Sequence, residues 1–458
     1  MPISSFSRRW MLQAALMGLG GFTLNSIGQA RAATLRGKTI IVIGAGLSGL
    51  AAASALKKQG AEVVVIEARN RIGGRIHTDW SMGPPFEHGA GWIHGPSENN
   101  PTKKLADAVG AEYFVTDDEN LVVFDENGRE ISEDDLTEIA DNWESALQFI
   151  DAELETFDKR SLELALKELR PSALSDPGVR WAMSAFTEFS KGAPIEKLSA
   201  TLHDDDKFFD NPDVVLTSGY DEILMPLAEG LDIQLSNPVR KIEYDNGRVA
   251  VTTIEGVVEG DYCICSVPLG VLKAGSIAFD PKLPQGHQAN IDKLGFGSVT
   301  KIALKFSVPF WDIATQYFGI MTEPKGRWNY WLNYRTFADE NILLGISVGA
   351  YAQVADRMTD EEMTADALEA LRDVWGDSVA EPTEILMTQW SKDPWTLGAY
   401  AYPTPGSQTS TSDDLSDPIE GRLFLCGEHT TFDYMATTHG AYISGLKAAK
   451  MIIEKVYK

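Results

Sequence analysis

A glycine-rich turn between an apolar run and a helical pattern is the feature that most constrains how this chain folds. Residues 38–43 form a short apolar run, residues 47–58 are rich in Ala and Leu at helical spacing, and residues 62–67 form a second apolar run. The turn reads Gly44-Ala45-Gly46-Leu47-Ser48-Gly49. A strand, a helix and a strand in such close succession predict a βαβ unit of a parallel sheet.

Each glycine of the turn has a physical purpose in such a unit. Gly44 permits the tight turn, Gly46 lets the backbone approach a pyrophosphate, and Gly49 lets the helix pack closely on the sheet. The free amides and the positive dipole end of the helix attract phosphates. Glu67 ends the second apolar run, where its carboxylate can accept hydrogen bonds from ribose hydroxyls. The sequence therefore predicts a dinucleotide site.

Two further segments indicate which dinucleotide binds. The loop after Glu67 contains Arg69, Gly74 and Arg75. Its glycines let the chain pass close to a longer cofactor, and an arginine can meet the phosphates. Near the C-terminus, an apolar run over residues 423–426 leads into Gly427 and Glu428, and this acid can bond the ribitol hydroxyls of a flavin. These segments favour FAD over NAD.

Longer strings then carry a resemblance to a known family. They span residues 89–96, 267–273, 294–301 and 436–445. With the motifs above, they make the chain similar to the flavin-containing amine oxidase family from Lys38 to about Ile453. The likeness is closest to the polyamine oxidase branch, which is related to the acetylpolyamine and spermine oxidases and to the flavin histone demethylase.

The resemblance implies an α/β fold in which a Rossmann-like FAD-binding domain is interleaved with an α+β substrate-binding domain. The FAD-binding domain is expected to comprise residues 33–100, 216–298 and 395–458. The substrate domain is expected to comprise residues 101–215, which look mostly helical, and residues 299–394.

Catalytic and substrate-binding residues also follow from the resemblance. Lys301 matches a lysine that holds a water against flavin N5, and Tyr400 and Tyr442 match an aromatic pair that sandwiches the amine. His94 is expected to orient or tune the substrate amine. Glu188 and the run Asp204-Asp205-Asp206 are candidates, on their charge alone, for holding the distal ammonium of a polyamine, although a solvated loop is the plainer interpretation of the run. Plainer interpretations stay open: a strand lysine, tyrosines that pack in a core, and a structural histidine in a Gly-rich turn.

The remaining residues are expected to contact the cofactor. Trp390 matches a tryptophan beside the isoalloxazine, Val239 a residue whose backbone meets the adenine, and Thr438 a residue whose amide meets the flavin pyrimidine edge. Gly91 and Trp92 belong to the string over residues 89–96. Relatives with a covalent flavin place a cysteine where this chain has Ala399, so FAD is expected to bind without a covalent bond.

The implied reaction is the oxidation of an amine, with a polyamine as the leading substrate and O2 reduced to H2O2. Three alternatives remain open: an oxidase of a monoamine or an amino acid, a flavin desaturase or porphyrinogen-type oxidoreductase, and a flavoprotein that serves as a binding scaffold. The seven histidines show no metal-ligand spacing, so no metal site is expected.

The N-terminus predicts export. Arg8 and Arg9 precede an apolar stretch interrupted by glycines, and Ala30-Arg31-Ala32 supplies a small-x-small cleavage site. This pattern is typical of a twin-arginine signal cut after about Ala32, with the export machinery as a partner and a periplasmic or secreted product. The alternative is an anchor that stays attached to the membrane.

The charge of the chain bears on its partners. The formal net charge is −26, and loss of the leader would remove three arginines and no acid. Such a surface repels nucleic acid and anionic lipid and attracts polycations. The acidity can also serve only to keep a secreted protein soluble.

Overall fold

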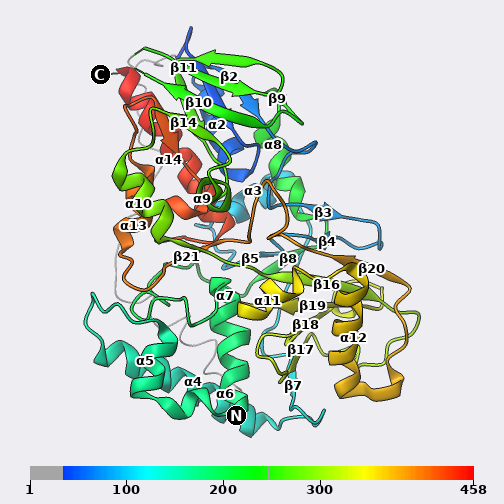
Figure 1. The fold of residues 1–458 in the computed structure, drawn as a ribbon. Coiled ribbons are helices and arrows are strands. Elements are labelled where there is room, and N and C mark those ends of the chain that lie inside the picture. Colours follow the sequence, from blue (N-terminus) through cyan, green and yellow to red (C-terminus); the bar gives the residue numbers. More distant parts are fainter. Residues whose placement is uncertain (1–34, 246, 458) are drawn as a thin grey trace.

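The fold is described by a computed structural model that covers residues 35–245 and 247–457. The predicted export signal, residues 1–32, lies outside the described residues. Figure 1 shows two lobes, with β2 (Glu62–Ile66) in one lobe and β16 (Thr300–Lys305) and β19 (Ile342–Ser347) in the other. Within residues 35–457 we find no helix with both the length and the apolar character needed to cross a bilayer.

The first lobe is built around a parallel sheet, which confirms the predicted βαβ unit. Helix α2 (Leu47–Lys58) connects β1 (Thr39–Ile43) to β2 (Glu62–Ile66), and the two strands pair in parallel. The full strand order is β22 (Leu423–Leu425), β13 (Tyr262–Cys265), β1, β2 and β9 (Asp232–Gln234). One sheet thus collects strands from three distant parts of the chain.

Side-chain alternation along β1 explains why both faces of this sheet are covered. Ile40 and Val42 pack in a core with α2, whereas Ile41 and Ile43 pack in a second core on the other face. On the first face, α2 lies beside α14 (Thr438–Tyr457), as Figure 1 shows. On the second face lies a mostly antiparallel sheet of β12 (Val257–Gly260), β11 (Val249–Thr253), β10 (Val239–Tyr244) and β14 (Ala278–Asp280).

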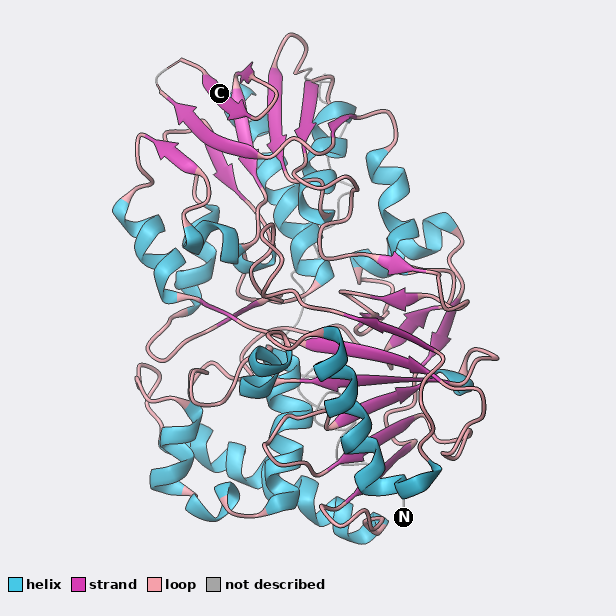
Figure 2. Ribbon diagram, turned by 45° about the vertical axis from the view of Figure 1, so that its right-hand side comes forward, coloured by secondary structure: helices cyan, strands magenta, loops and turns pink. Residues whose placement is uncertain are grey.

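The second lobe contains a sheet between two apolar layers, and Figure 2 shows its strands beside a layer of helices. Its strand order is β20 (Glu384–Met387), β16 (Thr300–Lys305), β19 (Ile342–Ser347), β18 (Tyr330–Asn333), β17 (Tyr317–Ile320) and β7 (Leu121–Phe124). On β16, Ile302 and Leu304 face the core that includes α12 (Asp360–Trp375), whereas Ala303, like Val299 just before the strand, faces the other core. Lys301 therefore points to the side of Val299 and Ala303.

Short ladders lie between the lobes (Figure 1). They comprise β3 (Thr78–Asp79) with β4 (Phe86–Glu87), β5 (Trp92–Ile93) with β8 (Val214–Leu216) and β6 (Tyr113–Val115), and β15 (Gly295–Phe296) with β21 (Ala401–Tyr402). The other α-helices are α3 (Pro101–Val109), α4 (Glu133–Glu153), α5 (Leu162–Leu169), α6 (Pro177–Ala182), α7 (Phe189–Lys191), α8 (Met225–Ala228), α9 (Leu269–Ala274), α10 (Gln285–Lys293), α11 (Gly349–Ala355) and α13 (Thr409–Asp413).

The segment that looked mostly helical in the sequence is more varied in the structure. Strands β6 and β7 interrupt it, because their runs of Tyr, Phe and Val fit a pleated surface better than a helix. A π-helical stretch, Met183–Glu188, separates α6 from α7. Such stretches are rare and often mark functional sites.

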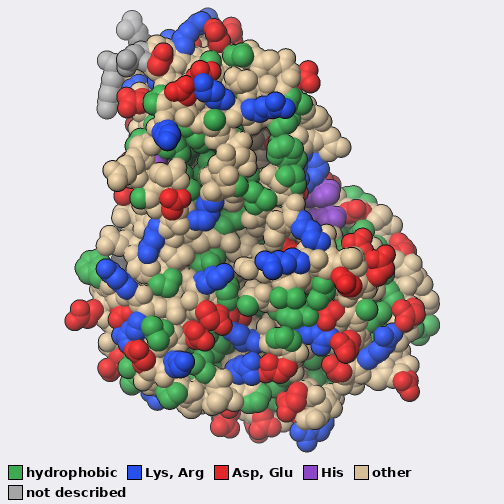
Figure 3. Space-filling view, in the orientation of Figure 1, with side chains coloured by type: hydrophobic (Ala, Val, Ile, Leu, Met, Phe, Trp, Pro, Cys, Tyr) green, Lys and Arg blue, Asp and Glu red, His purple; other side chains and the backbone are tan. Residues whose placement is uncertain are grey.

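On the face shown in Figure 3, acidic and basic side chains are interspersed and do not form a patch of one sign.

The close contact of α2 and α14 generates a prediction about stability. A Cβ at Gly445 would lie 2.1 Å from the carbonyl oxygen of Ser48, so Gly445→Ala must push the two helices apart. We expect a loss of about 1–3 kcal/mol in the free energy of unfolding, measured by denaturant titration. Gly286→Ala on α10 is the matched control, because nothing lies within 4 Å of the place that its Cβ would take. Equal stability of the two variants would contradict the prediction.

Candidate active site

A cavity of about 1330 Å³ is lined by residues of both lobes. At one end it is lined by Gly44, Gly46 and Glu67 of the first lobe. Farther along, Lys301 from the second lobe and Tyr400 also line it. Ordinary small-molecule pockets measure roughly 300–1,000 Å³, so this cavity has room for a large cofactor together with a substrate.

At the dinucleotide end, Glu67 holds the glycine turn in place. One carboxylate oxygen of Glu67 accepts from the Ala45 amide at 2.7 Å, and the other accepts from the Arg69 amide at 2.8 Å. Gly49 does not line the cavity; a Cβ there would lie 2.0 Å from the carbonyl oxygen of Gly44. Gly49 therefore provides close packing, whereas Gly44 and Gly46 form the surface that faces the cavity.

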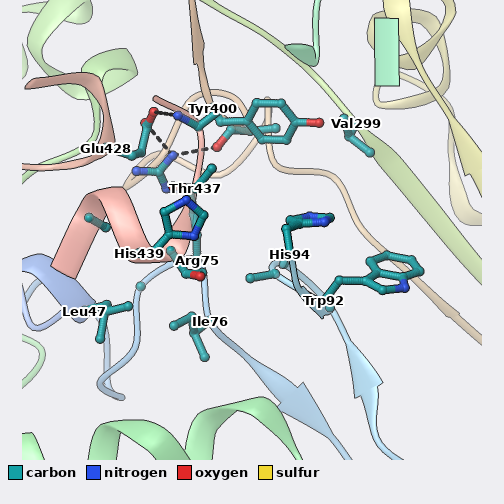
Figure 4. Close-up of a pocket in the computed structure, with 18 of the residues that line it drawn as sticks. Leu47, Arg75, Ile76, Trp92, His94, Val299, Tyr400, Glu428, Thr437 and His439 are labelled. Atoms are coloured by element: carbon teal, nitrogen blue, oxygen red, sulfur yellow. Dashed lines mark hydrogen bonds and ion pairs between the residues drawn. The ribbon is translucent and has the colours of Figure 1, made fainter. Parts of the chain in front are cut away.

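The two arginines predicted near the phosphates line the cavity but have partners within the protein. Arg69 contacts Asp393 and Thr396, each at 2.6 Å. Arg75 donates to Glu428 at 2.9 Å and to the Ala399 carbonyl oxygen at 2.7 Å (Figure 4). Gly74 lies in the same wall. Phosphate contacts by Arg69 and Arg75, and ribitol contacts by Glu428, stay predictions.

Five other residues predicted to contact the cofactor line the same cavity: Gly91, Trp92, Val239, Trp390 and Thr438. The Trp390 ring is fixed because its Nε1 donates to the His88 carbonyl oxygen at 2.8 Å. Thr438 is the first residue of α14, and its hydroxyl lies 2.9 Å from the Tyr220 hydroxyl. The fold thus gathers residues separated by more than 300 positions in the chain around one space.

Lys301 is buried on the cavity wall, with 5% of its surface exposed. Its Nζ donates to the carbonyl oxygens of Gly89 at 2.6 Å and Glu87 at 3.0 Å, which leaves one of its three hydrogens free to point elsewhere. Burial lowers the pKa of Lys301 to about 8, partly opposed by the charge of Glu87. This lysine is not a solvated strand residue.

The structure does not bring the predicted aromatic pair together at the cavity. Tyr400 lines the cavity, and its hydroxyl donates to the Phe189 carbonyl oxygen at 2.5 Å. Tyr442 is not among the lining residues; it packs against the core of the first lobe. Thr437, directly before α14, lines the cavity instead (Figure 4). Matching strings identified the helix, but the helical turn decides which of its residues face the cavity.

The prediction that Glu188 binds substrate is wrong. Glu188 is fully buried outside the cavity lining, at the end of the π-helical stretch. One of its carboxylate oxygens accepts from Lys325 Nζ at 2.5 Å and from the Ile195 amide at 3.0 Å. The carboxylate therefore closes the turn that follows α7 and is not available to a ligand.

The sequence analysis did not predict two aspartates that lie near His94, Asp213 and Asp118. His94 lines the cavity, and its Nδ1 lies 2.5 Å from Asp213, whose other oxygen accepts from the Gly95 amide at 3.0 Å. Desolvation would lower the pKa of His94, but Asp213 overrides it and the pKa is raised. Asp118 also lines the cavity, and burial together with the charge of Asp213 raises its pKa to about 6. Nothing in the sequence pairs residues so far apart.

Aromatic rings lie in the same part of the cavity wall. Tyr330 lies 5.2 Å from Tyr317 and 6.1 Å from Phe189 between ring centroids, and Phe189 lies 6.4 Å from Trp92. All four side chains line the cavity. Aromatic faces attract ammonium groups, and carboxylates do so more strongly. This part of the cavity is therefore suited to a cation with an apolar stem.

Comparison with known proteins identifies the family. The family described as "Flavin containing amine oxidoreductase" matches residues 47–453, and one described as "Pyridine nucleotide-disulphide oxidoreductase" matches residues 8–82. "Polyamine oxidase 4" of Oryza sativa subsp. japonica is 31% identical over 90% of this chain and 88% of its own. "Polyamine oxidase 2" of Arabidopsis thaliana is 32% identical over 91% and 88%.

A histone demethylase and a solved oxidase structure also match. "Lysine-specific histone demethylase 2" of Homo sapiens is 30% identical over 91% of this chain and 53% of its own length. A solved structure of putrescine oxidase bound to putrescine matches with a TM-score of 0.74 at 22% identity, covering 93% of this chain and all of that one. The predicted fold class is confirmed.

The position of Tyr400 generates a prediction about turnover. A Cβ at Gly192 would lie 2.5 Å from Tyr400 Cε2, so Gly192→Ala must displace the ring. Misplacing a group at the reacting centre by about 1 Å can cost on the order of 100-fold, and we expect a loss of this order in kcat/KM for an amine substrate, with the flavin retained. Steady-state kinetics and the flavin-to-protein absorbance ratio measure the two quantities.

Gly110→Ala controls for backbone strain, because both glycines have a positive φ, of 60° and 71°, and Gly110 has no neighbour within 4 Å. If Gly110→Ala loses as much activity as Gly192→Ala, the effect does not come from Tyr400.

Proposed function

This chain belongs to the family of flavin-containing amine oxidoreductases, and we propose that within it the chain is an FAD-dependent polyamine oxidase that reduces O2 to H2O2. The observation that carries the proposal is the acidic and aromatic part of the cavity, formed by Asp118, Asp213, Tyr317 and Tyr330. A monoamine has no second ammonium for these groups to bind, whereas a polyamine does. The names of the curated relatives agree with this substrate class.

The residues present fit FAD. The glycine turn and Glu67 lie at one end of a continuous cavity, and Lys301 and Tyr400 line it farther along. Ala399 lines it beside Tyr400 and offers no thiol, so we propose that the cofactor binds without a covalent bond. Acid precipitation should then leave all the flavin in the supernatant; a pellet that keeps its flavin would contradict this point.

When bound, the flavin accepts a hydride from the carbon beside the amine nitrogen and passes two electrons to O2, while the resulting imine is hydrolysed to an aldehyde and a smaller amine. The protein's part is to position that carbon. Tyr400 offers a ring face to the amine. The ammonium of Lys301 repels a protonated nitrogen and so favours the neutral amine, which is the form that can lose hydride.

The cavity favours an amine over an amino acid. An amino acid oxidase would need an arginine in the cavity to pair with the substrate carboxylate. Among the described residues, the arginines that line the cavity are Arg69 and Arg75, and each already donates to a carboxylate of the protein. The acidic part of the cavity would repel a substrate carboxylate.

Asp118 generates a prediction about substrate choice. We expect peroxide formation with spermidine and spermine in preference to monoamines, and Asp118→Asn to raise KM for the polyamines about 10-fold or more while monoamine turnover changes little. Because the pKa of Asp118 is raised to about 6, KM of the native enzyme should rise as pH falls through 6, and the variant should lose this dependence. Steady-state peroxide assays from pH 5 to 8 measure this.

Asp107→Asn removes the same charge from the exposed surface of α3 and serves as the control. Equal preference for monoamines and polyamines in the native enzyme would exclude the proposed substrate class.

We further propose that the twin-arginine signal exports the protein with its cofactor already bound. Replacing Arg8 and Arg9 with Lys should leave flavin-loaded enzyme in the cytoplasm, because the arginine pair is the targeting signal. Cell fractionation followed by flavin fluorescence measures this. Equal periplasmic amounts of the variant and the native protein would refute it.

A further inference from the structure

Glu87 is a buried acid that the proposed reaction does not use. It lies on β4, 8% exposed, outside the cavity lining. Thr78 Oγ1 lies within 3.0 Å of both of its carboxylate oxygens, and the Tyr220 amide donates to one of them at 2.8 Å. These donors favour the ionised carboxylate, although no cation among the described residues is hydrogen-bonded to it.

The nearest cation is Lys301, from the other lobe. Its Nζ is 3.0 Å from the carbonyl oxygen of Glu87 itself. A methyl group placed on Gly91 would lie 3.4 Å from Lys301 Nζ and 3.6 Å from Glu87 Cβ, so both groups border the same small space. The Trp92 ring also lies near Lys301, with its centroid 5.6 Å from Nζ. Both charges lie in protein, where water screens them little.

We propose that Glu87 is a positioning residue for Lys301: its buried charge keeps the lysine in the ammonium form, while its carbonyl oxygen helps to direct Nζ to the cavity. The role of that ammonium in flavin chemistry rests on the proposed function. The pairing itself rests on the contacts above.

Other charged and polar groups around the pair do not replace this interaction. His88 faces Lys301, but burial lowers its pKa, so the ring is neutral near pH 7. Asp221 faces Glu87 and disfavours its charge, and Tyr220 and Tyr334 also lie close, with pKa values raised by burial. Burial raises the pKa of Glu87 to about 7, against the opposing effect of its hydrogen bonds and Lys301. The acid and the lysine therefore titrate as a coupled pair in the neutral to mildly alkaline range.

The test is a pH titration of the flavin absorbance of the oxidised holoenzyme between pH 6 and 10, without substrate. A charge beside the cofactor changes its absorption, so we expect a step in the native enzyme that is absent in Lys301→Met. In Glu87→Gln the midpoint of this step should fall by about one pH unit or more, because the charge that favours the ammonium is gone. Gln keeps an oxygen that can accept from the Tyr220 amide.

Two further variants test whether the midpoint depends on the charge of Glu87. Thr78→Val weakens the ionised form of Glu87 without removing the acid, so its midpoint should also fall, by less; it replaces Glu87→Gln if that variant does not fold. Asp221→Asn removes an acid near Glu87 and should not lower the midpoint. The absence of a Lys301-dependent step in the native enzyme, or an unchanged midpoint in Glu87→Gln, overturns the proposal.

The titration requires no amine. If no amine is oxidised and the midpoint still moves, the proposed function fails and the pair stands. If polyamines are oxidised and the midpoint does not move, the proposed interaction of Glu87 with Lys301 is refuted and the proposed function is not. In the native enzyme and in Glu87→Gln alike, the rate at which O2 reoxidises the reduced flavin should change with pH around the midpoint measured for that same enzyme.

Discussion

The contacts of one carboxylate, Glu428, hold the walls of the site together. Glu428 is 4% exposed; it accepts from Arg75 on one oxygen and from the Ala401 and Ala436 amides on the other. Arg75 in turn donates to the Ala399 carbonyl oxygen. Four chain segments therefore meet at one ion pair: the loop after β2, the strand that follows Tyr400, the turn after β22, and the entry to α14. Removing Arg75 would be costly, because Glu428 is buried and its charge would be left unpaired.

The same geometry explains why the site forms at the junction of the lobes. The first lobe supplies the glycine turn and Glu67, whereas the ammonium beside the cavity comes from the second lobe. Lys301 enters from β16 of that lobe and donates to the carbonyl oxygens of Glu87 and Gly89. These carbonyls belong to the short segments between the lobes, so the position of Lys301 depends on how the lobes pack. Changes at this junction are expected to affect chemistry even when they lie away from the cavity.

Local patterns in the sequence predicted local structure well. The strand, turn and helix around Gly44 form as expected, because apolar periodicity and glycine placement act over a few residues. Most of the predicted residues also line one cavity. The failures concern direction and long-range partners. Tyr442 sits on the correct helix but faces the core, and Glu188 pairs with Lys325, 137 residues away. The His94–Asp213 pair could not be predicted for the same reason, since no pattern in one sequence records which distant side chains meet.

The distribution of charge along the cavity gives the proposed substrate class its physical basis. The nitrogen to be oxidised must be neutral, and the fixed positive charge of Lys301 together with the ring of Tyr400 suits that form. Asp118 favours the opposite, a protonated nitrogen that compensates for its negative charge, whereas Asp213 already has His94 as a partner. A molecule with a single nitrogen cannot satisfy both conditions. A chain with amines separated by methylene groups can, since one nitrogen loses its proton beside Lys301 while another keeps its proton among the carboxylates, with the apolar stem against the rings of Tyr317 and Tyr330. The cavity thus selects for the spacing between charges as well as for charge itself.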